Sequence, residues 1–370
     1  MKEVGWGTHQ FPSVNRLNDG RIAVKYHIVH DDAESYGLES GWAVSDDEGN
    51  TWSDVPAGDV PSVKAQFGTL LPSGRRLRAI TPRPFPIPKD LYQKLLGKSG
   101  GRRNGFPVED MPDGYFEKDK WLFGISEPGS KTEKEFLSKI DFPGMTLRLT
   151  KDGVVRPDAF GPVCLAPDGS IWVAHYDNGR NPVNLGFTSY YACYFFRSLD
   201  EGKSFRLMSW IQYLPDTNEF PDAFTTEGFC EPYLAFMSDG SMIALMRTGS
   251  GTPSYLARSV DGGITWCKPV RFDDCGVFPQ LLSLKSGITL ASYGRPGIFV
   301  RATDDPSGLN WQKPVEILPR DVLVMRSCCY TGMLAFDENN VLLVYSDFQY
   351  PDKSGIKRKT ILSRRIHICS

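Results

Sequence analysis

Short apolar runs separated by tight turns dominate the chain. The runs are rich in Val, Ile, Phe, Tyr and Trp, and they end at pairs such as Asp-Gly and Ser-Gly, as at 238–246. Apolar runs of about four to eight residues bounded by turn residues are typical of β-strands. Stretches with the 3.6-residue period of a helix are nearly absent. The pattern predicts an all-β protein.

Six turn signals divide these runs. They stand at 18–20, 72–74, 167–169, 238–240, 285–287 and 337–340. Gly and Asn tolerate positive φ, so these signals favour tight hairpins. Their recurrence at roughly 50–70 residues indicates an internal repeat. Six repeats of four strands predict a six-bladed β-propeller.

A second repeated motif lies between these turns. It has the form Ser-x-Asp-x-Gly-x-x-aromatic, with clean copies at 45–52, 198–205 and 259–266 and degenerate ones at 150–153 and 303–311. The Ser and Asp side chains are expected to cap backbone N–H groups of a turn, with Gly at a special φ and the ring packed beneath. The copies resemble the Asp-boxes (BNR repeats) of the sialidase, or neuraminidase, propeller superfamily, in which these motifs are structural. The resemblance implies a single propeller over 1–370.

A polar segment interrupts the match at 82–145. It is rich in Pro, Lys, Arg and Glu, and its parts at 90–96 and 131–140 are expected to be helical. Within a propeller, a segment this long is expected to be an insertion in the second blade that serves as a lid or a partner surface.

Charge and composition exclude several function classes. Lys and Arg number 42 against 44 Asp and Glu, and no basic patch carries interleaved aromatics, so nucleic acid is not an expected partner. No apolar run approaches the roughly 18 residues of a membrane span, so no membrane partner is expected. The N-terminus lacks a signal-peptide pattern, which favours a cytoplasmic location over a trimmed secreted chain. The 8 cysteines and 5 histidines show no metal-ligand spacing, so free thiols and no metal are expected.

Two segments resemble those that bind the substrate carboxylate and supply the base in sialidases. In the first, an acid precedes a predicted strand and an arginine ends the next one. The resemblance implies that Glu231 is the general base, with Glu227 as the alternative, and that Arg247 binds the carboxylate. In the second, Arg295 stands eight residues before the degenerate motif at 303, where the family carries another carboxylate-binding arginine.

A third segment, 327–334, resembles the one that carries the nucleophilic tyrosine of sialidases, which implies that role for Tyr330. The anomeric carbon of a sialic acid bears a carboxylate, which would repel a carboxylate nucleophile. A neutral phenol avoids that repulsion until a Glu removes its proton.

The chain departs from the family at two linked positions. Gln10 stands where sialidases carry the first of three arginines, and Ser346 stands where a Glu steadies that arginine. Both members of one ion pair are replaced by neutral groups, as expected because either charge alone would be costly. Two arginines can still hold a carboxylate, so the expected substrates widen to other acidic sugars.

The acid/base residue of the family lies in the loop before the first Asp-box. Counting back from that motif reaches Glu34, with Asp32 as the nearest aspartate. A different chemistry is suggested by His175 and Tyr176, which end a predicted strand close to Arg180. Such a pair can abstract a proton α to a uronate carboxylate, as in polysaccharide lyases, or it can form part of a pocket wall.

These observations favour an exo-acting glycoside hydrolase that releases a terminal sialic acid or a related acidic sugar and needs no cofactor. A uronate-cleaving lyase and a non-catalytic glycan-binding propeller are the alternatives. The expected partner is a carbohydrate, and the oligomeric state stays open.

Overall fold

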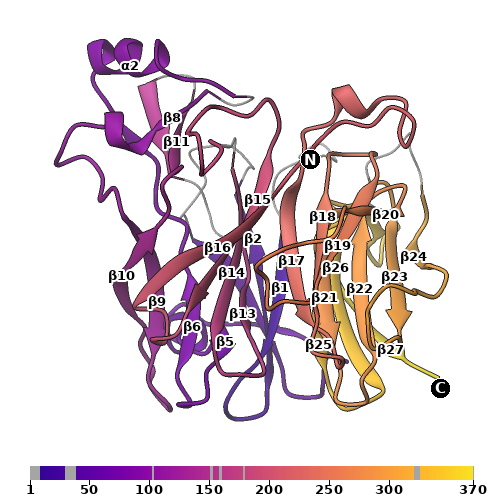
Figure 1. The fold of residues 1–370 in the computed structure, drawn as a ribbon. Helices are drawn as coiled ribbons and strands as arrows, with labels where there is room; N and C mark the ends of the chain where they lie inside the picture. The colour runs from indigo at the N-terminus through magenta and orange to yellow at the C-terminus, as the bar shows by residue number, and fades with distance from the viewer. Residues whose placement is uncertain are drawn as a thin grey trace.

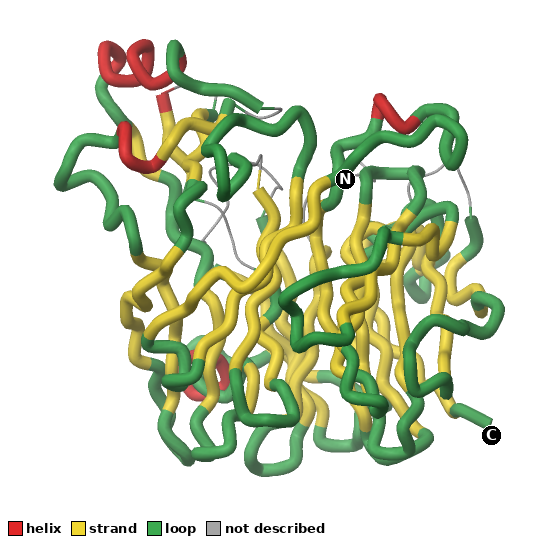
Figure 2. The backbone as a smooth tube through the Cα atoms, viewed as in Figure 1, coloured by secondary structure: helices red, strands yellow, loops and turns green. Residues whose placement is uncertain are grey.

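A computed structural model describes residues 9–29, 39–101, 104–150, 153–157, 161–177, 180–320 and 326–369. Over these ranges strands are the dominant regular structure, and the α-helices are the short α1 (Val60–Lys64) and α2 (Lys89–Leu96). The all-β prediction is therefore confirmed. Figures 1 and 2 show the strands standing side by side between two layers of loops.

Most strands form four-stranded antiparallel units in which consecutive strands pair. The first unit contains β1 (Gln10–Arg16), β2 (Ile22–His27), β3 (Ser40–Ser45) and β4 (Ser53–Asp54). Two later units are β17 (Cys230–Phe236), β18 (Met242–Arg247), β19 (Ser254–Ser259) and β20 (Val270–Asp273), then β21 (Val277–Ser283), β22 (Thr289–Gly294), β23 (Ile298–Thr303) and β24 (Val315–Leu318). The last sheet has three described strands, β25 (Thr331–Ala335), β26 (Asn340–Pro351) and β27 (Lys357–His367).

Two further units merge into one eight-stranded sheet. One unit contains β5 (Thr69–Leu70), β6 (Arg76–Ala79), β9 (Lys120–Ser126) and β10 (Lys134–Asp141). The other contains β13 (Val163–Leu165), β14 (Ile171–Asp177), β15 (Ala192–Ser198) and β16 (Ser204–Gln212). They join because β10 pairs in parallel with β16 at their outer edges.

Neighbouring units pack against one another around a closed ring. Their inner strands meet in sequence, β14 against β17, β17 against β21, β21 against β25, and β25 against β1. The ring continues from the first unit to the second, where the Arg76 guanidinium donates to the Arg16 carbonyl at 3.1 Å. Apolar side chains fill the spaces between units, as where Val24 of the first meets Val344 of the last.

The turns form where the sequence predicts them. All six hairpin signals join the first strand of a unit to its second. The Ser-x-Asp-x-Gly turns join third strands to fourth strands, and the predicted caps are present: Ser45 Oγ accepts from the Gly49 N–H at 2.8 Å, and Asp47 accepts from the Thr51 N–H at 2.8 Å. The same bonds recur at 198–204 and 259–265. In the copy at 150–153, positions 151 and 152 lie outside the described residues.

The segment 82–145 divides into two parts. In the large sheet its strand β9 pairs with β6, and its strand β10 pairs with β9. The rest joins a separate small sheet of β7 (Phe85–Pro86), β8 (Gly105–Pro107), β11 (Thr146–Leu149) and β12 (Val154–Arg156). With α2, this small sheet stands at the end opposite the hairpin turns (Figure 1).

The helix expected at 90–96 is confirmed by α2, but the one expected at 131–140 is wrong. This stretch forms β10, in which Ser138 and Ile140 are buried while Leu137 and Lys139 are exposed. Burial with a period of two fits a strand that has one covered face.

Candidate active site

The first strands of three units begin with the same irregularity. In β1, β17 and β21, two residues oppose one on the neighbouring strand. The first of the two has a positive φ and precedes a proline: these residues are Phe11 (φ 52°), Glu231 (48°) and Phe278 (40°). Backbone strain of this kind clusters at functional sites, and β-bulges re-aim side chains. All three residues lie around one further side chain, that of Tyr330.

Tyr330 directly precedes β25, the first strand of the last sheet. Its phenol donates a hydrogen bond to Oε1 of Glu231. The backbone N–H of Phe278 donates to the other carboxylate oxygen, Oε2, at 2.8 Å. The Phe278 ring stacks on the phenol ring with centroids 4.2 Å apart and planes 5° apart, and the Phe11 ring lies 4.6 Å away. The nucleophile and base predicted from the sequence are therefore in hydrogen-bond contact, between two aromatic rings.

Arg247, the last residue of β18, contacts the same carboxylate. Its Nη1 lies 2.7 Å from Oε1 of Glu231, and its Nη2 lies 3.5 Å from Oε2 of Glu227. The side chains of Arg247 and Glu231 are only 9% and 6% exposed, whereas that of Glu227 is 31% exposed. Of the two glutamates, Glu231 is the one that accepts the hydrogen bond from the Tyr330 hydroxyl.

Arg295 follows the end of β22 and approaches the cluster from the next unit. It donates from Nη2 to the Cys328 carbonyl at 2.6 Å and from Nη1 to Oγ of Ser250 at 3.1 Å. Its guanidinium carbon lies 5.8 Å from the centroid of the Tyr330 ring. Both predicted carboxylate-binding arginines therefore lie beside the phenol.

The environment sets the protonation of the pair. Burial raises the pKa of Tyr330 well above its usual value, and the Glu231 carboxylate raises it further against the opposing charges of Arg247 and Arg295. Burial also raises the pKa of Glu231, but the charge and hydrogen bond of Arg247 outweigh it, so that the net pKa lies below the usual value. At neutral pH a protonated phenol therefore faces an ionised carboxylate.

Gln10 does not join this cluster. It directly precedes the bulge of β1, the position that Cys230 holds in β17 and Val277 holds in β21, and all three side chains are buried. Among the described residues, neither amide atom of Gln10 has a hydrogen-bond partner. Ser346 is also buried but contacts Oγ of Ser327 at 3.0 Å instead of Gln10.

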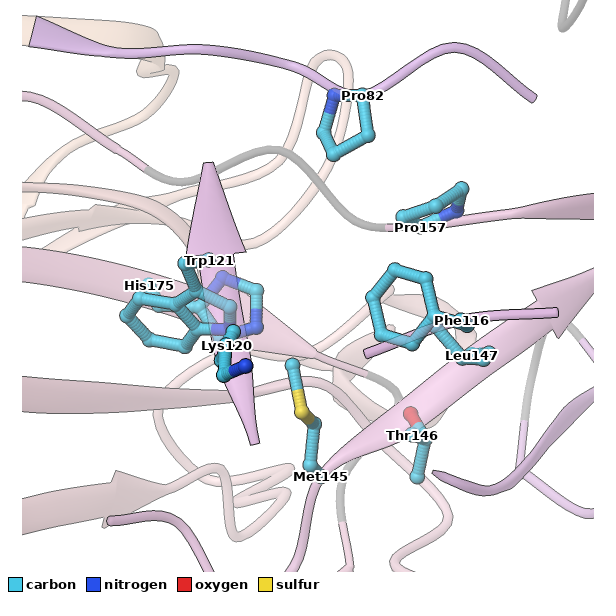
Figure 3. Close-up of a pocket in the computed structure, with 9 residues that line it drawn as sticks. All are labelled: Pro82, Phe116, Lys120, Trp121, Met145, Thr146, Leu147, Pro157 and His175. Carbon is cyan, nitrogen blue, oxygen red and sulfur yellow. The ribbon is translucent and has the colours of Figure 1, made fainter. Parts of the chain in front are cut away.

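His175 and Tyr176 are successive residues of β14, and the centroids of their rings lie 6.4 Å apart. The His175 ring lies 5.7 Å from that of Trp121, beside a cavity of about 10 Å³ (Figure 3). A space of that size is about the minimum that holds one water molecule. Tyr176 faces the cluster: burial raises its pKa, and the charge of Glu231 raises it further. The two rings are therefore neighbours, and the lyase role considered for them stays a prediction.

Glu34 and Asp32, the predicted acid/base candidates, lie outside the described residues. Their predicted role therefore stays a prediction.

A cavity of about 270 Å³ opens between the first and last sheets. Its lining, which includes Tyr26 and Trp52, contains none of the residues around Tyr330. The described part of the chain holds no group of three or more His, Cys, Asp or Glu placed to bind a metal. No helix in these same ranges is long and apolar enough to cross a bilayer.

The sequence did not predict the two aromatic rings that flank the Tyr330 ring, those of Phe11 and Phe278. A signal for them was present, because each precedes a proline at the start of a first strand, as Glu231 does. In all three strands, the residue that precedes the proline is the one whose side chain lies beside Tyr330.

No protein-family model and no curated protein matches the chain. Solved structures do share its arrangement. A protein of unknown function from Dyadobacter fermentans DSM 18053 aligns over 100% of this chain and 96% of its own, with 19% identity and a TM-score of 0.64. The Hadza microbial sialidase Hz136 aligns over 97% of this chain and 65% of its own, with 15% identity and a TM-score of 0.57.

Glycosidases of known structure therefore share this fold. An α-L-arabinanase from Penicillium chrysogenum, complexed with arabinobiose, aligns over 96% of this chain and 92% of its own, with 12% identity and a TM-score of 0.51. At these identities the likeness establishes the fold alone. In a propeller the sheets surround a central channel, and the cluster around Tyr330 is built from the inner strands of that ring.

Proposed function

We propose that the chain is a six-bladed propeller glycoside hydrolase that releases a terminal acidic sugar, sialic acid or a related one, from glycans. One observation carries this proposal: the Tyr330 phenol donates to Glu231, and Arg247 holds the same carboxylate oxygen. A nucleophile in contact with a base that a third group orients is the arrangement that covalent catalysis requires.

In the proposed reaction, the Tyr330 oxygen attacks the anomeric carbon while its proton passes to Glu231. The bond from that carbon to the glycosidic oxygen breaks, and the leaving oxygen takes a proton from Glu34 or Asp32. A water molecule, deprotonated by the same acid residue, then displaces the tyrosine, which regains its proton from Glu231. The sugar is released with its anomeric configuration retained.

The acidic substrate is inferred from the charges around the phenol. Arg247 and Arg295 reach the cluster from adjacent units, and together they offer guanidinium donors to one carboxylate. A phenol nucleophile suits a sugar whose anomeric carbon carries a negative group, because its attack starts from a neutral oxygen. The names of the solved neighbours, a sialidase and an arabinanase, support glycoside cleavage on this fold but leave the sugar open.

The proposal is tested with a 4-methylumbelliferyl sialoside and a matching uronide. We expect the wild-type protein to release the fluorophore and Arg247→Ala to lose that release. If the wild type cleaves neither substrate, the hydrolase proposal is rejected.

A non-catalytic glycan-binding propeller is the second candidate, favoured by the neutral Gln10 in place of a third arginine. It predicts binding of a free acidic sugar, detected by saturation-transfer NMR, with no release from either fluorogenic substrate.

A further inference from the structure

A second carboxylate, that of Glu227, shares the arginine of the proposed clamp. The backbone of Glu227 is held in place just before β17: its N–H donates to the Thr248 carbonyl at 2.8 Å, and its carbonyl accepts from the Tyr191 N–H at 2.9 Å. Its side chain extends to Arg247, where Oε2 lies 3.5 Å from Nη2. A fixed backbone thus carries a partly exposed acidic side chain to the outer edge of the guanidinium.

The guanidinium of Arg247 has an inner edge, Nη1, and an outer edge, Nη2, and the two make ion pairs of unequal strength. The inner edge makes a 2.7 Å contact with Glu231, whose side chain is 6% exposed, whereas the outer edge makes the 3.5 Å contact with Glu227, whose side chain is 31% exposed. An ion pair that is longer and better solvated is weaker. The only other described contact of the Glu227 carboxylate is a weak one with the Cys230 thiol, at 3.8 Å. The outer pair is therefore the one that an incoming anion can replace.

Charge balance points the same way. The two carboxylates of Glu227 and Glu231 offset the two guanidinium groups of Arg247 and Arg295. A substrate carboxylate that binds Arg247 through Nη2 meets the negative charge of Glu227 at that edge. A neutral sugar meets no such competitor.

We propose that Glu227 competes with the substrate carboxylate for the outer edge of Arg247 and so sets how strongly the site prefers acidic over neutral sugars. This inference rests on the proposed function. Glu227 is a specificity-determining residue in this scheme, while Glu231 and Tyr330 carry the chemistry.

The test measures affinity by calorimetry with two matched probes, 2,3-didehydro-2-deoxy-N-acetylneuraminic acid and its methyl ester. The ester has the same ring but no negative charge. We expect Glu227→Gln to bind the acid about 5- to 10-fold more tightly than the wild type, because a neutral amide leaves Nη2 to the ligand. Binding of the ester should stay unchanged.

Glu219→Gln is the matched control. Glu219 lies in the same connection between β16 and β17, and no described contact joins its side chain to Arg247. Removing its charge should leave the affinity for the acid at the wild-type value. A gain in Glu219→Gln equal to that in Glu227→Gln would reduce the effect to general surface charge and overturn the inference.

The two proposals fail in different ways. If the wild type binds the acid and Glu227→Gln binds it equally or less tightly, Glu227 merely supports Arg247 and the inference is wrong. Glu227→Ala must change affinity in the same direction as Glu227→Gln, which guards against a folding defect in one variant. If the wild type binds neither probe, the proposed function itself is rejected, and the inference with it.

Discussion

Tyr330 and Glu231 lie 99 positions apart in the chain and are joined by a hydrogen bond from phenol to carboxylate. Each stands at the start of the first strand of its own sheet, and the N–H of Phe278 from the sheet between them holds the second carboxylate oxygen at 2.8 Å. Three sheets thus position the phenol and the carboxylate of the proposed nucleophile and base. Glu231 is buried and Tyr330 is half-buried, and the geometry of the pair leads to the predictions that follow.

Replacing Tyr330 with Phe should reduce sialoside cleavage at least about 10³-fold, because the nucleophilic oxygen is lost while the ring can still stack on Phe278. Affinity for an acidic sugar should change little. Rates of fluorophore release and calorimetry on the same protein check both statements. Tyr190→Phe removes a hydroxyl that donates to the Phe224 carbonyl at 3.2 Å, and should cleave at the wild-type rate. Wild-type turnover in Tyr330→Phe would exclude the proposed nucleophile.

The stacking of Phe278 on Tyr330 should matter for rate. Phe278→Ala keeps the backbone N–H that binds Glu231 but removes the ring 4.2 Å from the phenol ring. We expect kcat to fall about 10- to 100-fold with a smaller change in KM, since the phenol loses its fixed orientation. Phe278→Tyr preserves the stacked ring and should restore most of the rate. An unchanged kcat in Phe278→Ala would show that the Phe278 ring does not orient the Tyr330 phenol.

The effects of replacing Glu231 and Arg247 on the free energy of unfolding should be coupled, because the two side chains form a buried ion pair. Removing one partner of a buried pair leaves an uncompensated charge and costs about 3 kcal/mol. Arg247→Met should therefore lower the free energy of unfolding by about that amount. The double variant Arg247→Met with Glu231→Gln should lose much less than the sum of the two single changes. Urea unfolding of the four proteins measures the coupling, and additive losses would argue against a direct interaction.

The Ser-x-Asp-x-Gly turns should make stability depend on pH in acid. Hydrogen bonds from the side chain and backbone of Thr51 lower the pKa of Asp47 from 3.8 to about 2, and those of Thr265 do the same for Asp261. Because the folded pKa lies below the unfolded one, this stabilisation is fully present above about pH 4 and is lost as pH falls toward about 2.

Asp261→Asn tests this linkage. The variant should be less stable than the wild type at pH 6, and the difference should shrink steadily between pH 4 and pH 2. Urea unfolding at a series of pH values gives the two curves. A difference that stays constant across that window would mean that the carboxylate charge contributes nothing to these turns.

Local chemistry accounts for what was predictable in the fold. A turn such as 238–240 needs only Asp and Gly in succession, and it joins β17 to β18 as expected. The Ser-x-Asp-x-Gly turn likewise encodes its own hydrogen bonds within eight residues. Local chemistry does not account for everything at Gly263, because a Cβ there would lie 2.6 Å from the Trp172 side chain on the neighbouring sheet. Its need for glycine comes from φ and from tertiary packing together.

The wrong helix at 131–140 has a similar explanation. Charged residues and single apolar ones in that segment fit a helix as well as a strand when read alone. Pairing of β10 with β9 and β16 decides for the strand, because it satisfies backbone groups on both edges.

The sequence by itself determined the strands, the hairpin turns, the capped turns and, through resemblance, the residue types of the site. Only the tertiary structure decided that Glu231 and not Glu227 meets Tyr330, and that the rings of Phe278 and Phe11 flank the phenol. The physical reason is the separation along the chain of the residues that interact. Turns and caps are made by neighbours in the chain, whereas the site is made where first strands from distant repeats meet, and that meeting depends on how whole sheets pack around the ring.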